Sequence, residues 1–215
     1  MELLKRYGDD PVTISTDRLH EINATERSDW WAMPKYDGWR RFVYWMDGKL
    51  TLLSKSRGAG AEARRELPRE LMEQLRAMTN RWPDGTAGDV EWLGPRGGFE
   101  NELIFHDLLY SAGEWVGHMG FERRHPLMTR LFEASEAKVL APAIRVVEAY
   151  YDVDLEELFE EQRKNPKSEG LVLKRVGVPL MQSDVFKIAD KVLDNYDWVK
   201  VKYRDVSHSD MARRK

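Results

Sequence analysis

Cysteine is absent from the 215 residues of this chain. Its absence excludes disulfide bonds, thiolate chemistry and the zinc sites that cysteine builds. The five histidines, at positions 20, 106, 118, 125 and 208, show no HxxxH spacing, so we expect no histidine-built metal site. Any metal ion would therefore be a hard cation held by carboxylate and phosphate oxygens, which points to magnesium.

Long apolar runs are absent as well. No stretch approaches the ~18 consecutive apolar residues of a membrane span, and the first residues lead into no signal-peptide apolar region. The sequence thus predicts a cytoplasmic protein without membrane association. Hydrophobic residues at 42% and charged residues at 33% are typical of a globular protein, and the length suits one domain with a substantial core.

An excess of positive charge is also missing, since 34 Lys and Arg against 37 Asp and Glu give a net charge of −3. Bulk affinity for nucleic acid comes from cations that neutralise phosphates, and this balance weakly disfavours it. The local charge differs from the average, because Arg40, Arg41, Lys55 and Arg57 lie close together along the chain.

Lys35 opens the most informative stretch, which reads Lys-Tyr-Asp-Gly-Trp-Arg. Runs rich in apolar and aromatic residues, 30–33 and 42–46, flank it, and we expect them to be strands. A lysine at a strand-to-turn corner can be shielded from water, and because burial disfavours the charged ammonium, the amine can become a nucleophile. A solvated lysine beside a common Asp-Gly turn is the alternative, and the stretch taken alone favours it.

Three further fragments change this assessment through their order along the chain. They are Asp89-Val90-Glu91, the segment from Ser168 to Lys174 (Ser-Glu-Gly-Leu-Val-Leu-Lys), and the segment from Trp198 to Lys202 (Trp-Val-Lys-Val-Lys). With the Lys35 stretch, this ordered set resembles the nucleotidyltransferase superfamily that contains ATP-dependent DNA ligases, RNA ligases and messenger-RNA capping enzymes. The resemblance runs from about Trp31 to Tyr203.

The resemblance implies an α+β fold with mainly antiparallel sheets, flanked by helices around a nucleotide cleft. We expect residues 1–29 to be a lead-in with a short helix over 18–24, residues 30–205 to be the nucleotidyltransferase domain, and residues 206–215 to be a basic tail. Hydrophobic periodicity predicts helices over 62–78, 121–134 and 152–164, strands over 86–93, 102–110, 144–150, 168–175, 184–188 and 196–203, and a hairpin that turns at Asp47-Gly48.

The resemblance also implies roles for the lysines and for one glutamate. Lys35 matches the lysine that becomes adenylated, and Glu169 matches a carboxylate that holds a divalent metal, here Mg²⁺. Lys200 and Lys202 share one face of the last strand, where two cations are costly without an anion, and in the superfamily they grip the α-phosphate. An edge strand with solvent-facing lysines is the alternative.

Four residues are expected to bind the nucleotide. Arg40 would fix the ribose or a phosphate, Glu91 matches a ribose-binding glutamate, and Lys174 faces the nucleotide. His106 stands where the ligases have a phenylalanine that stacks on adenine, while Phe105 points to the opposite face of the strand. A register shift by one residue would exchange the roles of these two.

A contact to nucleic acid is expected after the second hairpin strand. The segment from Ser54 to Gly58 resembles a Ser-Arg-Asn-Gly-like segment of the ligases, in which the arginine contacts phosphate. Arg57 is the matching residue, although Gly58 replaces the asparagine. A loop arginine in water is the alternative.

The resemblance implies an ATP-dependent DNA ligase with roles in DNA repair and replication. Lys35 would form a lysine-AMP intermediate, the AMP would pass to a 5′-phosphate of nicked nucleic acid, and a 3′-hydroxyl would displace it. Three features are closer to ATP-dependent DNA ligases than to RNA ligases: the Asp-Gly-x-Arg form with Pro34 before Lys35, the Ser-Lys-Ser-Arg-Gly segment and the Asp-Leu-Leu-Tyr strand. The alternatives are an RNA ligase, a capping-type nucleotidyltransferase, and a nucleotide- or nucleic-acid-binding module that has lost turnover.

About a dozen residues follow Tyr203, too few for the OB-fold domain that follows the last lysine strand in the superfamily. We therefore expect weak or partner-dependent nick sealing, with that domain on another polypeptide, or else a minimal ligase or an enzyme for part of the cycle.

Overall fold

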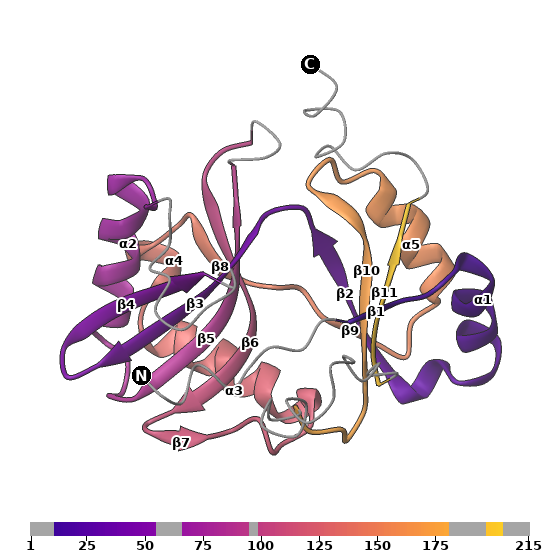
Figure 1. Cartoon of the computed structure of the whole chain (residues 1–215), viewed down its shortest axis with the longest axis horizontal. Helices are drawn as coiled ribbons and strands as arrows, with labels where there is room; N and C mark the ends of the chain where they lie inside the picture. Colours follow the sequence, from indigo (N-terminus) through magenta and orange to yellow (C-terminus); the bar gives the residue numbers. More distant parts are fainter. Residues whose placement is uncertain (1–10, 55–65, 95–98, 181–196, 204–215) are drawn as a thin grey trace, which may run out of the picture. The chain divides into compact units, whose positions relative to one another are not determined.

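The computed structural model describes residues 11–54, 66–94, 99–180 and 197–203 (Figure 1). Over these residues the fold is α+β, as predicted, with two mainly antiparallel sheets and five α-helices. The chain divides into two compact units. Unit 1 comprises residues 1–37, 120–122 and 148–215, and unit 2 comprises residues 38–119 and 123–147.

Unit 1 is built on a five-stranded sheet with the strand order β1-β11-β10-β2-β9. β10 pairs antiparallel with both β2 and β11, whereas β1 pairs parallel with β11 and forms one edge of the sheet. The strands are β1 (Val12–Thr13), β2 (Trp30–Tyr36), β9 (Tyr150–Tyr151), β10 (Ser168–Arg175) and β11 (Trp198–Lys202). The unit also contains helices α1 (Thr16–Thr25) and α5 (Leu155–Arg163) and the 3-10 turn η2 (Arg27–Asp29).

Side-chain caps fix where both helices of unit 1 begin. The Ser15 hydroxyl accepts the backbone N–H of Arg18 at 3.1 Å. The Asp154 carboxylate accepts the backbone N–H groups of Glu156 and Glu157 at 3.0 and 2.9 Å. Such caps satisfy donors of the first turn that have no partner inside the helix. Bonds from these backbone groups also lower the pKa of Asp154.

The core of unit 1 lies between the two helices and one face of the sheet. It contains Leu19 and Ile22 of α1, Leu155, Leu158 and Phe159 of α5, and Trp30, Ala32, Leu171, Leu173, Val199 and Val201 of the strands. Because successive residues of a strand point to opposite faces, the residues between these face the other side of the sheet.

Unit 2 is built on a six-stranded sheet with the order β4-β3-β5-β6-β7, and β8 pairs parallel with β6. The strands are β3 (Trp39–Met46), β4 (Lys49–Ser54), β5 (Thr86–Leu93), β6 (Glu102–Ser111), β7 (Glu114–Trp115) and β8 (Ile144–Val146). Its helices are α2 (Arg69–Thr79), α3 (Phe121–Ala134, from Arg123 onward) and α4 (Ala137–Leu140). The predicted hairpin turn is observed, with φ of +52° at Asp47 and +67° at Gly48.

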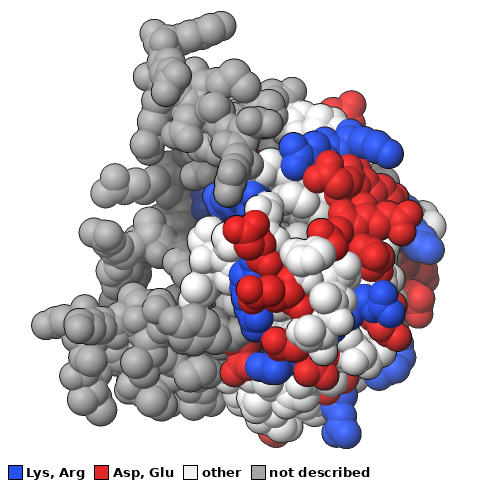
Figure 2. Space-filling view, turned by 90° about the vertical axis from the view of Figure 1, so that its right-hand side faces the viewer, with Lys and Arg blue, Asp and Glu red and all other residues white. Residues whose placement is uncertain are grey.

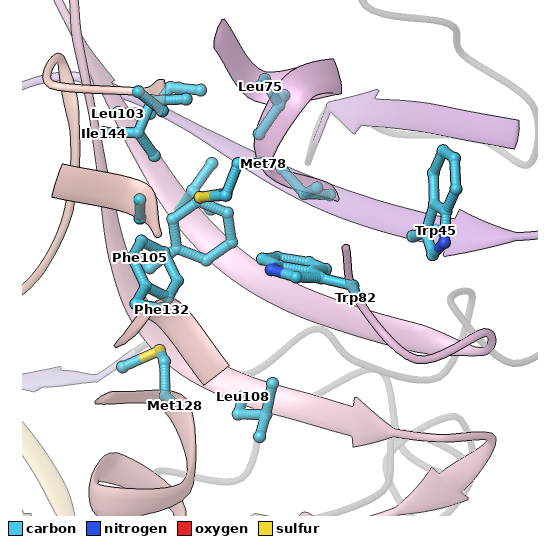
Figure 3. Close-up of a cluster of buried hydrophobic side chains, with 14 of the residues drawn as sticks. Trp45, Leu75, Met78, Trp82, Leu103, Phe105, Leu108, Met128, Phe132 and Ile144 are labelled. Carbon is cyan, nitrogen blue, oxygen red and sulfur yellow. The ribbon is translucent and has the colours of Figure 1, made fainter. Parts of the chain in front are cut away.

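The core of unit 2 is rich in aromatic rings (Figure 3). Phe105 is fully buried and makes edge contacts with Trp82 and Phe132, at centroid distances of 5.6 and 4.9 Å. Leu75 and Met78 of α2 and Met128 of α3 complete this part of the core. Phe105 thus occupies the core-facing position that the sequence predicts for it.

Several predicted elements have the observed bounds, namely the strands over 86–93 and 168–175 and the helix over 121–134. The predicted helix over 62–78 begins only at Arg69, because Pro68 is its N-cap with ψ of 144°, and residues 62–65 lie outside the described residues. The predicted strand over 184–188 also lies outside them. The predicted strand over 144–150 is divided between β8 and β9.

The N-terminal segment contributes more structure than the predicted short helix. Residues 12–25 include β1 and α1, whose Leu19 and Ile22 belong to the core of unit 1. No helix in the described part of the chain is long and apolar enough to cross a membrane.

Candidate active site

Four lysines lie in three successive rows on the face of the unit 1 sheet that points away from α1 and α5. In each row a β10 residue pairs with one residue of β2 and one of β11. The rows are Lys35-Gly170-Lys202, Met33-Val172-Lys200 and Trp31-Lys174-Trp198. Since paired residues of an antiparallel sheet point to the same side, this face concentrates four lysines, counting both lysines of the first row.

A β-bulge brings Glu169 to the lysine face. Ser168 pairs with Tyr36 and Gly170 pairs with Lys35, so β10 has one more residue here than β2, and that residue is Glu169. In a regular strand, Glu169 and Gly170 would point to opposite faces. The bulge requires glycine next to it, because Gly170 has φ of +145° and a Cβ would lie 1.9 Å from the backbone oxygen of Val201.

Glu169 forms ion pairs with two of the predicted catalytic lysines. One carboxylate oxygen accepts Lys35 Nζ, and the other accepts Lys202 Nζ at 3.1 Å. The side chains of Glu169 and Lys35 are 13% and 19% exposed, whereas that of Lys202 is 41% exposed. Burial alone would raise the pKa of Glu169, but the charges and hydrogen bonds of the two lysines lower it below its ordinary value.

Lys174 occupies a more buried position on the same face. Lys174 is 5% exposed, and its Nζ lies 4.4 Å from the ring centroid of Phe121 and 5.0 Å from that of Trp198. Aromatic faces attract a cation, and this attraction grows when water is excluded. Lys200, one row away, is half-buried.

The predicted convergence of residues 35, 169, 200 and 202 is therefore observed within unit 1. Lys35, Glu169 and Lys202 are joined by ion pairs, and Lys200 lies on the same sheet face. The arrangement combines an amine with cations and one carboxylate, which is a combination that suits a phosphate-bearing substrate.

Arg40 lies in unit 2, on a sheet face that also carries carboxylates. It pairs across the strands with Glu91, and its neighbour two residues on, Phe42, pairs with Asp89. The guanidinium binds Asp89 through two nitrogens, with Nε–Oδ1 of 2.9 Å and Nη2–Oδ2 of 2.6 Å. This bidentate pair fixes the orientation of Arg40.

Glu91 holds the corner that follows Lys35 in the sequence. Its Oε1 accepts the backbone N–H of Gly38 at 3.0 Å. A Cβ on Gly38 would lie 2.5 Å from the backbone oxygen of Trp92, so the close approach of β3 and β5 requires glycine here. Asp89 and Glu91 thus share one face, as predicted. Each carboxylate accepts a hydrogen bond from a donor of unit 2, Arg40 for Asp89 and the backbone of Gly38 for Glu91.

His106 is the extra residue of a bulge in β6. Val90 pairs with Phe105 and Asp89 pairs with Asp107, so His106 has no cross-strand counterpart on β5. It is half-buried, in contrast to Phe105. Arg57, which is expected to contact a phosphate of the nucleic acid, lies outside the described residues.

A buried ion pair stands directly after this bulge. Arg124 of α3 binds Asp107 through two nitrogens at 2.7 and 2.8 Å, with side-chain exposures of 1% and 0%. No local sequence pattern predicts this pair or the Arg40–Asp89 pair. The available signal for both was a carboxylate inside an otherwise apolar strand, which is costly to bury without a cation.

The residues present fit a magnesium ion that is held mainly by its substrate. No group of three His, Asp or Glu side chains suited to a metal occurs in the part of the chain that the structure describes. Glu169 offers carboxylate oxygens on the lysine face, and Mg²⁺ is commonly bound by one or two carboxylates together with phosphate oxygens and water.

Charge is distributed unevenly over unit 1. Figure 2 shows acidic side chains gathered over the helical side, and the exposed acidic residues of the two helices are Asp17, Glu21, Glu156, Glu157, Glu160 and Glu161. The opposite sheet face carries the lysine rows. A phosphate-bearing ligand is therefore favoured on the sheet face and repelled by the helical side.

Comparison with solved structures agrees with this geometry. A mycobacterial DNA ligase D complexed with ATP and MES superposes with a TM-score of 0.64 at 21% identity, over 94% of this chain and 62% of that one. A Lig E DNA ligase gives 0.56 at 18% identity, over 91% and 69%. An adenylated Chlorella virus DNA ligase gives 0.54 at 12% identity, over 93% and 67%.

This chain spans about six-tenths of the length of the ligase D structure. No protein-family model matches the sequence, and no curated protein matches it either. The solved structures match across most of this chain, and TM-scores of 0.54 to 0.64 show that the fold is shared. The chain therefore has the fold of the nucleotidyltransferase (adenylation) domain of DNA ligases.

Proposed function

We propose that the protein is an ATP-dependent polynucleotide ligase that acts on nicked DNA through a lysine-AMP intermediate. The observation that carries this proposal is the ion-paired cluster of Lys35, Glu169 and Lys202 on a ligase-type fold. A binding module would not need an amine held in this way among cations.

In the first step, the neutral Nζ of Lys35 attacks the α-phosphorus of ATP. A phosphorus–nitrogen bond forms, the bond to the β-phosphate oxygen breaks, and pyrophosphate leaves. The positive charges of Lys200 and Lys202 would stabilise the negative charge that develops on the phosphate oxygens.

Glu169 has two tasks in this proposal. In the structure it orients Lys35 through an ion pair, and its oxygens are also suited to a magnesium ion bound together with the nucleotide phosphates. When bound, the ion would neutralise phosphate charge. The carboxylate would then exchange its lysine contacts for the ion.

Four residues are assigned to the nucleotide. Arg40, oriented by Asp89, would contact ribose or phosphate, and Glu91 would accept a hydrogen bond from a ribose hydroxyl. His106 would stack on the base, and the cation of Lys174 would face the nucleotide. Arg57 is assigned to a phosphate of the nucleic acid.

In the second step, the 5′-phosphate of a nick attacks the lysine-AMP and takes up the AMP. In the third, the 3′-hydroxyl attacks that 5′-phosphate, AMP leaves, and the strand is sealed. DNA is the proposed substrate because the matched structures are DNA ligases, and such sealing would serve DNA repair or replication.

The test is incubation with α-labelled ATP and magnesium, followed by denaturing electrophoresis. Label should appear on the wild type and be lost in Lys35→Ala, whereas Lys49→Ala, an exposed lysine of β4, should keep it. No label under any condition would contradict the proposal and favour a binding module. Label from GTP in place of ATP would indicate a capping-type enzyme, and transfer to nicked RNA alone would indicate an RNA ligase.

A further inference from the structure

Arg41 is a buried arginine of unit 2 that no carboxylate neutralises directly among the described residues. It lies on β3, where it pairs with Ser54 of β4 and Val90 of β5, and only 7% of its surface is exposed. Its guanidinium carbon lies 5.4 Å from the ring centroid of Trp39 and 5.7 Å from that of Trp92. The cation is thus flanked by two indole rings.

Its hydrogen bonds are incomplete. A guanidinium has five N–H donors. Arg41 Nη1 donates to the backbone oxygen of Arg40 at 3.0 Å, and Nε is buried without any partner. Among the residues of unit 2 that the structure describes, two other arginines have little exposure, and each has a bidentate carboxylate, Asp89 for Arg40 and Asp107 for Arg124.

A charge in this position costs free energy of folding. Burial lowers the pKa of Arg41, and the more distant charge of Glu91 opposes this only in part. Unsatisfied buried donors are rare in folded proteins, and a guanidinium fork matches the oxygens of a phosphate. Arginine beside an aromatic face is a common arrangement for binding a nucleic-acid strand.

The position of Arg41 separates it from the residues assigned to the nucleotide. Arg40 pairs with Glu91, whereas Arg41 pairs with Val90, so their side chains leave opposite faces of the sheet. A phosphate at Arg41 would therefore belong to a ligand other than the ATP bound near Arg40. Trp39 is half-buried, packs against the core of unit 2 and makes an edge contact with Trp92 at a centroid distance of 5.5 Å, so both rings beside Arg41 are held in place.

We propose that Arg41, flanked by Trp39 and Trp92, binds a backbone phosphate of the nucleic-acid substrate. The proposal rests on the proposed function only for the class of ligand. When Arg41 neutralises a phosphate, the nucleic acid releases about one condensed counterion. Arg41 should therefore contribute to the salt dependence of the binding constant.

The experiment measures the Kd of a nicked duplex DNA with a 5′-phosphate, from 50 to 300 mM salt, without ATP and with EDTA to prevent sealing. Arg41→Met keeps volume and apolar contact but removes the charge. We expect the slope of log K against log salt to decrease by about 0.9, and Kd at 0.15 M salt to rise about fivefold.

Arg69→Met is the matched control, because it removes the same charge from a side chain that is 92% exposed on α2. It should leave the slope as in the wild type. If Arg41→Met behaves like this control in both slope and Kd, Arg41 is a structural residue and the proposal is wrong. Should Arg41→Met fail to fold by circular dichroism, Arg41→Gln takes the same test with the same outcomes.

A second arm identifies the source of the phosphate. The KM for ATP in lysine adenylation should be the same in Arg41→Met and the wild type. A raised KM with unchanged DNA binding would place the phosphate on ATP and overturn the assignment to nucleic acid. If Arg41→Met reduces the salt slope and weakens DNA binding as expected, but the wild type forms no adenylate, this inference stands and the proposed function is contradicted.

Discussion

Glu169 links the catalytic lysines to the pH dependence of stability. The two lysines keep its pKa in the folded protein below the ordinary value of about 4.5. The unfolded chain therefore takes up this proton first on acidification, so the stability that Glu169 contributes is present above pH 4.5 and is lost as the pH falls through the lowered pKa.

We expect Glu169→Gln to be less stable than the wild type at pH 7 by about 1 to 3 kcal/mol, because the hydrogen bonds to two charged groups lose their ionic character. The difference should shrink as the pH falls below 4.5 and through the lowered pKa. Urea unfolding at a series of pH values measures it. Glu157→Gln removes a charge from the exposed side of α5 and should differ little from the wild type at any pH; a constant deficit for Glu169→Gln down to pH 3 would contradict the pKa argument.

At this scale the sequence predicted the residues of the lysine cluster but not the two arginine–aspartate pairs of unit 2. Lys35, Glu169 and Lys202 could be found because each stands in a recognisable short motif. The pairs Arg40–Asp89 and Arg124–Asp107 depend on strand register and on how α3 packs, and neither is encoded in a local pattern. A bulge has no periodic signature, so the sequence could not show that His106 has no counterpart on β5.

The bulge in β10 is the element on which the cluster depends, and Gly170 is the residue that permits it. Gly170→Ala would place a Cβ against the backbone oxygen of Val201 and would hold alanine at a φ of +145°. We expect a loss of more than about 3 kcal/mol in the free energy of unfolding, since the backbone conformation alone costs 1 to 3 kcal/mol.

Gly177→Ala is the control for this prediction, because Gly177 also has a positive φ, +75°, but no atom lies within 4 Å of the added Cβ. It should lose only about 1 to 2 kcal/mol. Thermal and urea unfolding measure both variants. Equal losses would mean that the contact with β11 does not restrict position 170.

Element bounds were predictable where the hydrophobic period continued to the end of the element, as in β5, β10 and α3. The stretch 144–150 shows the limit. It has one continuous strand-like pattern, yet β8 pairs with β6 in unit 2 and β9 pairs with β2 in unit 1. A period of two identifies a strand but not its partner, and only the partner shows that the chain passes from one sheet to the other.

At the scale of the whole chain, the net charge of −3 conceals an uneven distribution. The helical side of unit 1 is acidic, and the lysine rows lie on the sheet face. Screening limits the reach of an exposed charge to about 8 Å at 0.15 M salt. The acidic residues of the helical side should therefore have little effect on the affinity of a ligand bound at the lysine rows.

We expect the double variant Glu157→Gln/Glu161→Gln to change the Kd for nicked DNA by less than about twofold at 0.15 M salt. Lys202→Gln, which removes a charge from the sheet face, should weaken binding by about fivefold. Fluorescence anisotropy with a labelled duplex measures both. A large gain in affinity for the double variant would indicate that DNA approaches the helical side.

The two-residue strand β1 has a consequence for how the protein can be shortened. Val12 and Thr13 pair with Val199 and Lys200, and the backbone N–H of Ile14 donates to Lys200 at 2.9 Å, so this short segment occupies the outer edge of β11. Removing residues 1–14 would expose the amide and carbonyl groups of β11 as an unpaired sheet edge, beside the buried Val199 and Val201. Such a truncated chain would be prone to intermolecular strand pairing, and its loss of solubility on expression would come from aggregation rather than from any change in catalytic residues.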